Sequence, residues 1–122
     1  MTTQPAPMTR VRVDQAKTGN LSDLTVLRFS GDITGTSNEA VFGAYRQVPA
    51  DTRKLVLDFS KVEYINSSGI ALVIELLMAA QKDNRTVRSF GLSPHFQKVF
   101  MMVGLNQYTH HYPDENSACA AW

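Results

Sequence analysis

The sequence has little of what marks secreted, membrane or disulfide-bonded proteins. Its 122 residues include a single cysteine, Cys119, which excludes an internal disulfide. The longest apolar run, Ile70 to Ala80, is interrupted by Glu75 and falls short of the roughly 20 residues that a membrane-spanning helix needs. The first residues, MTTQPAPMTR, lack the apolar segment of a secretory signal. These absences predict a cytoplasmic protein without a membrane span.

An excess of charge of one sign is also missing. The 12 Lys and Arg residues against 11 Asp and Glu give a net charge of +1, and no dense basic run occurs. Nucleic-acid binding needs a concentrated basic surface, so no DNA or RNA partner is expected. His110 and His111 would alternate faces on a strand and His95 would lie near a helix start, so we expect no metal and no cofactor.

The length fits one hydrophobic core. At 13.6 kDa and 43% hydrophobic residues, the chain has the size and composition of a single globular domain. Residues 1–9 are polar and contain two prolines, so they are expected to form a flexible tail. Residues 10–122 are predicted to form the domain.

Predicted strands alternate with predicted helices along this domain. The strand-like runs are Arg10 to Val13, Leu24 to Phe29, Lys54 to Phe59, Arg85 to Phe90 and Tyr108 to Tyr112. Helical patterns start near Thr36, at Ser67 or Ser68, at Pro94 and near Asp114. The alternation predicts an α/β fold with a mostly parallel or mixed sheet of about four or five strands and about four helices.

Local signals refine these elements. A turn at Thr18 to Asn20 would join the first two strands into a hairpin, and the nearly continuous apolar run Lys54 to Phe59 suits the middle of the sheet. Thr36 and Glu39 fit a capping box that opens a helix, with Val41, Ala44, Tyr45 and Val48 as its core face. In the third helix, Ser93 and Pro94 fit the N-cap and first helical position, and Gly104 fits the C-terminal stop. The inner stripe of this helix is predicted to consist of Phe96, Val99, Phe100 and Val103.

The longest predicted helix, ending at Lys82, has an unusually wide apolar arc. Steps of about 100° per residue place its core face at Ile70, Val73, Ile74, Leu77 and Gln81, with Leu72, Leu76 and Ala79 beside it and Ala71, Glu75, Met78 and Lys82 opposite. Two interpretations remain open. Neighbouring helices could bury the whole arc, or part of it could be an exposed surface for a partner.

The most informative segment is Asp58 to Ile70, DFSKVEYINSSGI, where the middle strand passes into the longest helix. In open α/β sheets, sites gather at the carboxyl ends of strands. The segment resembles the STAS domains of the anti-sigma factor antagonist family, in which an acidic residue, a hydrophobic residue and Ser precede Asp-Ser-Ser-Gly or Asp-Ser-Thr-Gly at a helix start. The likeness extends to Ser30–Ile33, to Gly91–Pro94 with Phe100, and to Gly104–Leu105.

This resemblance implies a non-enzymatic partner switch. An anti-sigma factor with serine-kinase activity would phosphorylate the first serine, Ser67, and a serine phosphatase of the PP2C type would reverse the reaction. The unphosphorylated form would bind the kinase and free the sigma factor. The loop Asp32 to Thr36 and the Ser67 helix should share one edge, with partner contacts expected from Asp32, Thr34, Asn66, Ser68, Gly69, Ala71, Leu72, Glu75 and Leu76.

Simple capping is the alternative role for Ser67 and Ser68, because serine is common before helices. The chain also departs from the family pattern, with Asn66 and Thr34 at positions where the family usually has Asp. Both differences remove a negative charge near the candidate site.

Two rival functions remain. A serine hydrolase would need a base and an orienting acid, and the chain lacks the Gly-x-Ser-x-Gly elbow. A STAS domain that acts without phosphorylation, as a scaffold or as a subunit of a lipid-transport complex, would share the fold.

Overall fold

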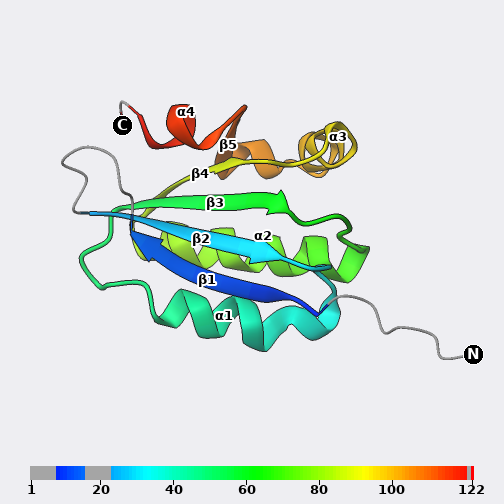
Figure 1. Ribbon diagram of the computed structural model, residues 1–122, viewed down its shortest axis with the longest axis horizontal. Coiled ribbons are helices and arrows are strands. Elements are labelled where there is room, and N and C mark those ends of the chain that lie inside the picture. Colours follow the sequence, from blue (N-terminus) through cyan, green and yellow to red (C-terminus); the bar gives the residue numbers. More distant parts are fainter. Residues whose placement is uncertain (1–7, 16–22, 121) are drawn as a thin grey trace, which may run out of the picture.

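The computed structural model of the chain describes residues 8–15, 23–120 and 122 (Figure 1). A sheet of five strands runs in the order β1-β2-β3-β4-β5. The strands span Arg10–Gln15 (β1), Leu24–Ser30 (β2), Lys54–Lys61 (β3), Thr86–Phe90 (β4) and Thr109–Tyr112 (β5). β1 is antiparallel to β2 and all other pairs are parallel, which confirms the predicted α/β fold with a mixed sheet.

The first two strands form the predicted hairpin. Arg10 pairs with Ser30 at one end of the ladder, and Gln15 pairs with Thr25 at the other. The predicted turn at 18–20 lies outside the described residues, as do residues 1–7 of the predicted tail.

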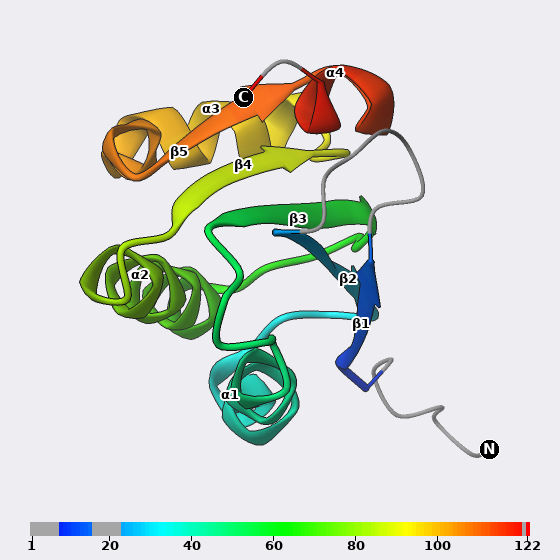
Figure 2. The same ribbon diagram turned by 90° about the vertical axis from the view of Figure 1, so that its left-hand side faces the viewer.

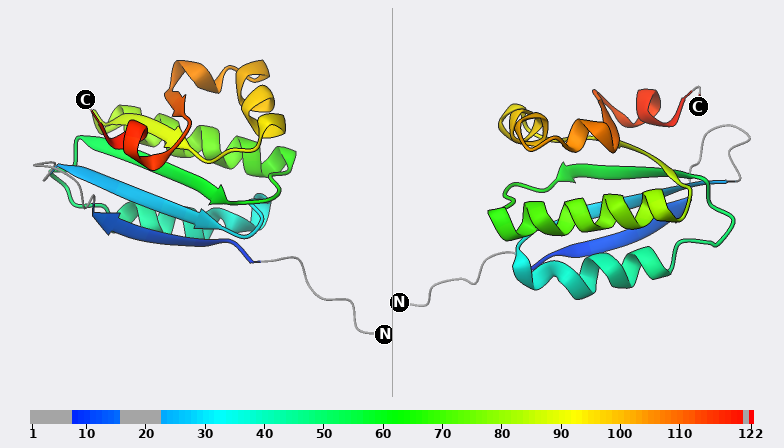
Figure 3. Two further views of the ribbon diagram at one scale, coloured as in Figure 1. Left: turned by 45° about the horizontal axis from the view of Figure 1, so that its top comes forward. Right: turned by 180° about the vertical axis from the view of Figure 1, so that it is seen from behind.

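The helices are distributed unequally over the two faces of the sheet. They span Asn38–Arg46 (α1), Ser67–Lys82 (α2), Pro94–Met102 (α3) and Glu115–Cys119 (α4), with 3-10 turns at Gly35–Ser37 (η1) and Leu105–Gln107 (η2). Helices α1 and α2 lie side by side on one face, and α4 lies on the other (Figures 2 and 3). Helix α3 shares the face of α2, because Phe100 packs edge-on against Phe59 with ring centroids 5.8 Å apart. No helix in the described part of the chain is long and apolar enough to cross a membrane.

Strand β3 lies in the middle of the sheet, as its apolar run predicts. Leu55, Leu57 and Phe59 are completely buried in the main core beneath the helices. Val56 is buried on the other face, in a smaller cluster that includes Cys119 of α4. With both faces covered over most of its length, β3 holds its carboxyl end in a fixed place.

Most of the wide apolar arc of α2 is buried, which favours cover by neighbouring elements, and Ile74 and Ala79 are partly buried against the same core. Leu72 is 5% exposed and Leu76 is fully buried, so the expectation of an exposed apolar surface at these two positions is wrong. The physical reason is that α2 packs against α1 as well as against the sheet, so two neighbours cover adjacent sides. Gln81, predicted on the core face, is exposed at the last turn.

The start of α1 differs from the prediction. Thr34, not Thr36, opens the segment: its backbone N–H donates to Ser37 Oγ at 2.8 Å, and its Oγ1 accepts from the Thr36 amide at 3.3 Å. The capping box therefore begins two residues earlier, on the turn η1, and Glu39 takes no part in it. The predicted core face of α1 is correct, since Val41, Ala44, Tyr45 and Val48 are all buried.

The third helix follows its sequence signals except at its end. Ser93 Oγ accepts from the Phe96 amide at 3.3 Å, Pro94 is the first helical residue, and Gly104 follows the helix with φ 82°. Val103, predicted on the inner stripe, is 49% exposed because it follows the last helical turn as the C-cap.

Candidate functional site

The connections after β2 and β3 are joined by backbone pairing beyond the ends of the strands. Ile33 and Ile65 form an isolated parallel bridge. The Ile33 amide donates to the Tyr64 carbonyl at 3.0 Å, and the Asn66 amide donates to the Ile33 carbonyl at 3.1 Å. The pairing holds the loop at 31–37 beside the start of α2, so these two segments share one edge as predicted.

Gly69 makes this close approach possible. A Cβ atom at Gly69 would lie 2.1 Å from the carbonyl oxygen of Ile33, which no side chain can accommodate without movement of the backbone. Gly35 lies on the other side of the contact, where a Cβ would meet Ser68 Cβ at 3.1 Å. The first turn of α2 is therefore packed directly onto the loop after β2.

Asn66 caps α2. It has an extended backbone, with φ −83° and ψ 177°, and its Oδ1 accepts from the Gly69 amide at 2.7 Å. Ser67 and Ser68 are the first two residues inside the helix, and neither hydroxyl forms a hydrogen bond with another described residue. The capping role considered for the two serines is therefore wrong, and both hydroxyls are exposed.

The surroundings of Ser67 favour an anionic group electrostatically. The backbone amides of the first helical residues have no acceptor within the helix, and the helix dipole adds partial positive charge at this end. No His, Asp or Glu side chain among the described residues is hydrogen-bonded to either serine hydroxyl. The geometry supplies a place for charge at Ser67 and no paired base.

The predicted contact residues divide into accessible and buried groups. Ser67, Ser68, Ala71 and Glu75 are exposed, while Asp32, Thr34 and Asn66 are partly exposed. Gly69, Leu72 and Leu76 are buried, so their side chains are not available to a partner, and this part of the expected contact set is corrected. The remaining residues form what we term the switch surface: Asp32, Thr34, Asn66, Ser67, Ser68, Ala71 and Glu75.

Tyr64 extends the exposed region next to the switch surface and was not singled out from the sequence. Its side chain is 53% exposed, and its ring packs edge-on against Phe96 at 6.4 Å between centroids. An aromatic residue in a short connection between a buried strand and a long helix was the signal available in the sequence.

The acidic residue that opens the motif has a structural role. Asp58 Oδ1 accepts from the Ser60 amide at 2.9 Å and from Ser60 Oγ at 2.6 Å, while its Oδ2 accepts from Arg28 at 2.9 Å. Gly91, with φ 89°, fits beside this turn because a Cβ there would lie 2.5 Å from the Ser60 nitrogen. These contacts hold the end of β3 and the chain that leads to Asn66.

Arg28 links this turn to the rest of the far face of the sheet. Besides Asp58 it donates to Asp14 at 2.6 Å and to both carboxylate oxygens of Glu115, at 2.8 and 3.1 Å. The hydrogen bond from Arg28 lowers the pKa of Asp14. One guanidinium thus ties β1, β3 and α4 to β2.

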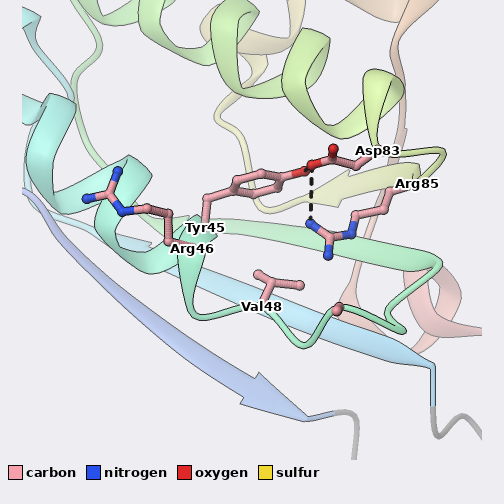
Figure 4. A pocket seen from close by; sticks show the side chains of 6 residues that line it. Tyr45, Arg46, Val48, Asp83 and Arg85 are labelled. Carbon is pink, nitrogen blue, oxygen red and sulfur yellow. Dashed lines mark hydrogen bonds and ion pairs between the residues drawn. The ribbon is translucent and has the colours of Figure 1, made fainter.

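A hollow of about 420 Å³ lies at the opposite end of the helices from Ser67 (Figure 4). Its polar groups bind one another: Tyr45 Oη donates to Asp83 at 2.6 Å, and the Arg85 guanidinium lies 5.1 Å from the centre of the Tyr45 ring. Burial raises the pKa of Tyr45 to about 12. In Figure 4 the Arg46 side chain points away from this cluster. The hydrogen bond between Tyr45 and Asp83 ties α1 to the end of α2.

Comparison with known proteins adds to this geometry. A family model described as "Mlab, STAS domain" matches residues 16–110. No curated protein matches the sequence.

Solved structures share the fold at low sequence identity. An anti-sigma factor antagonist from Mycobacterium paratuberculosis has a TM-score of 0.68 and 19% identity over 90% of each chain. The Bacillus cell fate determinant SpoIIAA, in its phosphorylated form, has a TM-score of 0.59 and 17% identity over 88% of this chain and 95% of its own. The murine solute carrier 26 family member A9 anion transporter has a TM-score of 0.71 and 12% identity over 92% of this chain and 21% of its own.

Proposed function

Because the chain belongs to the STAS domain family, we propose that it is an anti-sigma factor antagonist that works as a phosphorylation-controlled protein-interaction switch. Its unphosphorylated form binds an anti-sigma factor with serine-kinase activity, and phosphorylation of Ser67 releases that partner. A serine phosphatase of the PP2C type restores binding. One observation carries the proposal: the Ser67 hydroxyl is exposed and unbonded at the helix start because Asn66 supplies the cap.

The fold can hold a phosphate at Ser67. A phosphoserine carries a charge of about −1.5 to −2, and the free amides and dipole at the start of α2 favour that charge. The cap from Asn66 to Gly69 does not involve the serine oxygen, so modification breaks no hydrogen bond of the helix. The description of SpoIIAA in a phosphorylated form supports the view that a domain of this fold tolerates the group.

The same charge opposes association. The exposed stripe that follows Ser67 carries Ala71 and the acidic Glu75, and Asp32 lies in the adjacent loop. A partner that packs on this surface meets a small neutral hydroxyl before phosphorylation and a doubly charged, hydrated group after it. Desolvating that group without a matched cation is costly, so binding falls.

Intact-mass measurement and peptide mapping test the proposal directly. The protein is incubated with ATP and an extract of its host, beside the matched variants Ser67→Ala and Ser68→Ala. We expect one added phosphate in the wild type and in Ser68→Ala, located on Ser67, and none in Ser67→Ala. Phosphate on Ser68, or elsewhere in Ser67→Ala, would contradict the assignment.

A STAS domain that acts without phosphorylation is the second candidate. The matching family model is described as an Mlab STAS domain, and Asn66 and Thr34 replace the acidic residues that the anti-sigma antagonist pattern usually has. This candidate, a scaffold or a lipid-transport subunit, predicts lipid co-purifying with the native protein and no phosphate on Ser67.

A hydrolase would instead be revealed by labelling of Ser67 with an activity-based serine probe.

A further inference from the structure

A second hollow, of about 310 Å³, lies on the face of the sheet opposite α1 and α2. Helix α4 covers only part of this face, through contacts with β3, β4 and β5. The hollow lies over β1, β2 and β3, and the side chains of Arg10, Arg12, Arg28, Ser30, Asp58 and Lys61 contribute to its lining. Its lining shares no residue with the switch surface, and Ser30 lies two residues before Asp32, the nearest member of that surface along the chain.

Two rungs of the sheet cross this hollow. In the first, Arg12, Arg28 and Asp58 lie side by side on β1, β2 and β3, and Arg28 is neutralised by its ion pairs with Asp58, Asp14 and Glu115. This rung is an internally satisfied charge cluster. It fixes the floor of the hollow and leaves Arg28 with little capacity for an added ligand.

The second rung has cations without counterions. Arg10 pairs across the ladder with Ser30, which in turn pairs with Lys61. Arg10 and Lys61 are both exposed, and neither forms an ion pair with any described residue. Since neighbouring strands lie about 4.8 Å apart, the two cationic residues are roughly 10 Å apart, a separation that a carboxylate between them can bridge through both long side chains.

The strand that carries Arg10 is also an edge strand. Among the described strands β1 pairs only with β2, so no described strand occupies its outer edge. Arg10 and Arg12 point to the hollow, while Val11 and Val13 alternate to the other face, where they are half-buried against the core. A strand added at this edge would find cations on one face and apolar side chains on the other.

We propose that the β1 edge and the adjoining cationic hollow form a docking site for an extended acidic segment of a protein partner. The segment pairs with β1 through its backbone, directs carboxylates over the hollow toward Arg10 and Lys61, and places apolar residues beside Val11 and Val13. Charge complementarity selects the acidic residues, and the period of two along a strand selects their alternation with apolar ones. The site does not depend on Ser67.

Titration with a synthetic peptide of alternating Glu and Val, followed by backbone amide NMR, tests this site. We expect shifts in β1, around Ser30 and at Lys61, with an affinity that falls as salt is added. A block peptide of the same composition, with all Glu residues before all Val residues, should bind at least about tenfold more weakly because it cannot match the alternation. Shifts confined to α2 or α3 would overturn the proposal, as would equal affinity for the two peptides.

Matched charge reversals locate the binding. Arg10→Glu/Lys61→Glu should lower the affinity for the alternating peptide at least about tenfold, whereas Arg53→Glu/Lys98→Glu, with the same change in net charge at exposed sites elsewhere, should lower it less than about threefold. Circular dichroism verifies that both variants are folded. Equal losses in the two double variants would overturn the proposal.

Two further experiments distinguish an acidic peptide from other possible ligands of the hollow and from binding at the switch surface. Inorganic phosphate and phosphatidylglycerol vesicles should fail to displace the alternating peptide at concentrations where unlabelled peptide does so, and displacement by either would assign the hollow to simple anions or to a lipid surface instead. Ser67→Asp should bind the peptide as the wild type does. A loss of peptide affinity in Ser67→Asp would place the peptide on the switch surface. It would overturn the proposal of a separate docking site, whether or not Ser67 is phosphorylated.

Discussion

The amide of Gly69 donates to Asn66 Oδ1 at 2.7 Å, and this bond separates two roles that a serine at a helix start can combine. Capping is done by Asn66, which leaves the Ser67 hydroxyl exposed and free for modification. A phosphate added to a capping serine would replace the cap. Here the cap and the candidate phosphate acceptor are neighbouring residues, so each can be changed without removing the other.

Removing the cap at Asn66 should therefore destabilise the domain, whereas replacing it with a charged cap should alter the switch. Asn66→Ala is expected to lower the free energy of unfolding by about 1 kcal/mol, in the range found for N-caps. Asn66→Asp keeps an acceptor for the Gly69 amide, so its stability should be nearly unchanged, but the added negative charge beside phosphoserine should change the rates of phosphorylation or dephosphorylation. Chemical denaturation and rate measurements check both. Ser68→Ala is the control, and a loss in that variant equal to that of Asn66→Ala would contradict the assigned cap.

Substitutions at Ser67 should change binding without changing stability. Ser67→Ala is expected to bind the anti-sigma kinase constitutively, and Ser67→Asp to bind it poorly because its charge opposes desolvation at the contact. Calorimetric titration measures binding, and thermal denaturation should show stabilities within about 0.5 kcal/mol of the wild type, as for most surface changes. Tight binding by Ser67→Asp would argue against release by charge at this position.

Gly69→Ala should destabilise the domain at the contact between α2 and the loop after β2. Its new methyl group would overlap the carbonyl oxygen of Ile33, 2.1 Å away, so either the loop after β2 or the first turn of α2 must move. Overpacking of this kind typically costs about 1–3 kcal/mol. Gly43→Ala in α1 is the matched control, because its Cβ would meet only the end of the Arg46 side chain at 3.9 Å. That variant should be as stable as the wild type or up to about 1 kcal/mol more stable, as expected for Gly to Ala in a helix. Equal stability of the two variants would refute the close contact.

Two glutamate substitutions on α2 should behave in opposite ways. Ala71→Glu adds a charge to the exposed stripe beside Ser67, so it should weaken partner binding while the fold is retained. Leu76→Glu places a charge at a fully buried position and should unfold the domain. Calorimetry and circular dichroism distinguish the two effects. A folded Ala71→Glu variant with unchanged affinity would move the interface away from this stripe.

Stability should depend on pH through His111. Burial lowers the pKa of His111 from its ordinary value of 6.5, and its Nδ1 lies 3.3 Å from Ser89 Oγ. As pH falls below about 6.5 the unfolded chain takes up a proton that the folded chain resists, so the free energy of unfolding should fall until the lowered pKa is reached. Denaturant titrations between pH 5 and 8 should show a flatter profile for His111→Asn than for the wild type. A wild-type slope in His111→Asn would contradict the prediction.

Much of the architecture follows from local properties of the sequence. The continuous apolar run from Lys54 to Phe59 requires cover on both faces, which only a middle strand receives, and the structure places it there. Ser93, Pro94 and Gly104 mark the ends of α3 because the groups that satisfy or terminate its backbone lie within a few residues. Such signals act over one helical turn, so the sequence by itself contains them.

Tertiary contacts decided the features that depend on residues far apart in the chain. Helix α2 packs against α1, about 30 residues earlier, as well as against the sheet, and no periodicity within α2 could show that Leu72 and Leu76 would be buried in this arrangement. The identity of the cap was not predicted either: from the sequence, capping was considered for Ser67 and Ser68, although Asn is as good an N-cap as Ser. Pairing of Ile33 with Ile65, and the fit of Gly69 onto the Ile33 carbonyl, selected the register in which Asn66 is the cap and Ser67 is left free.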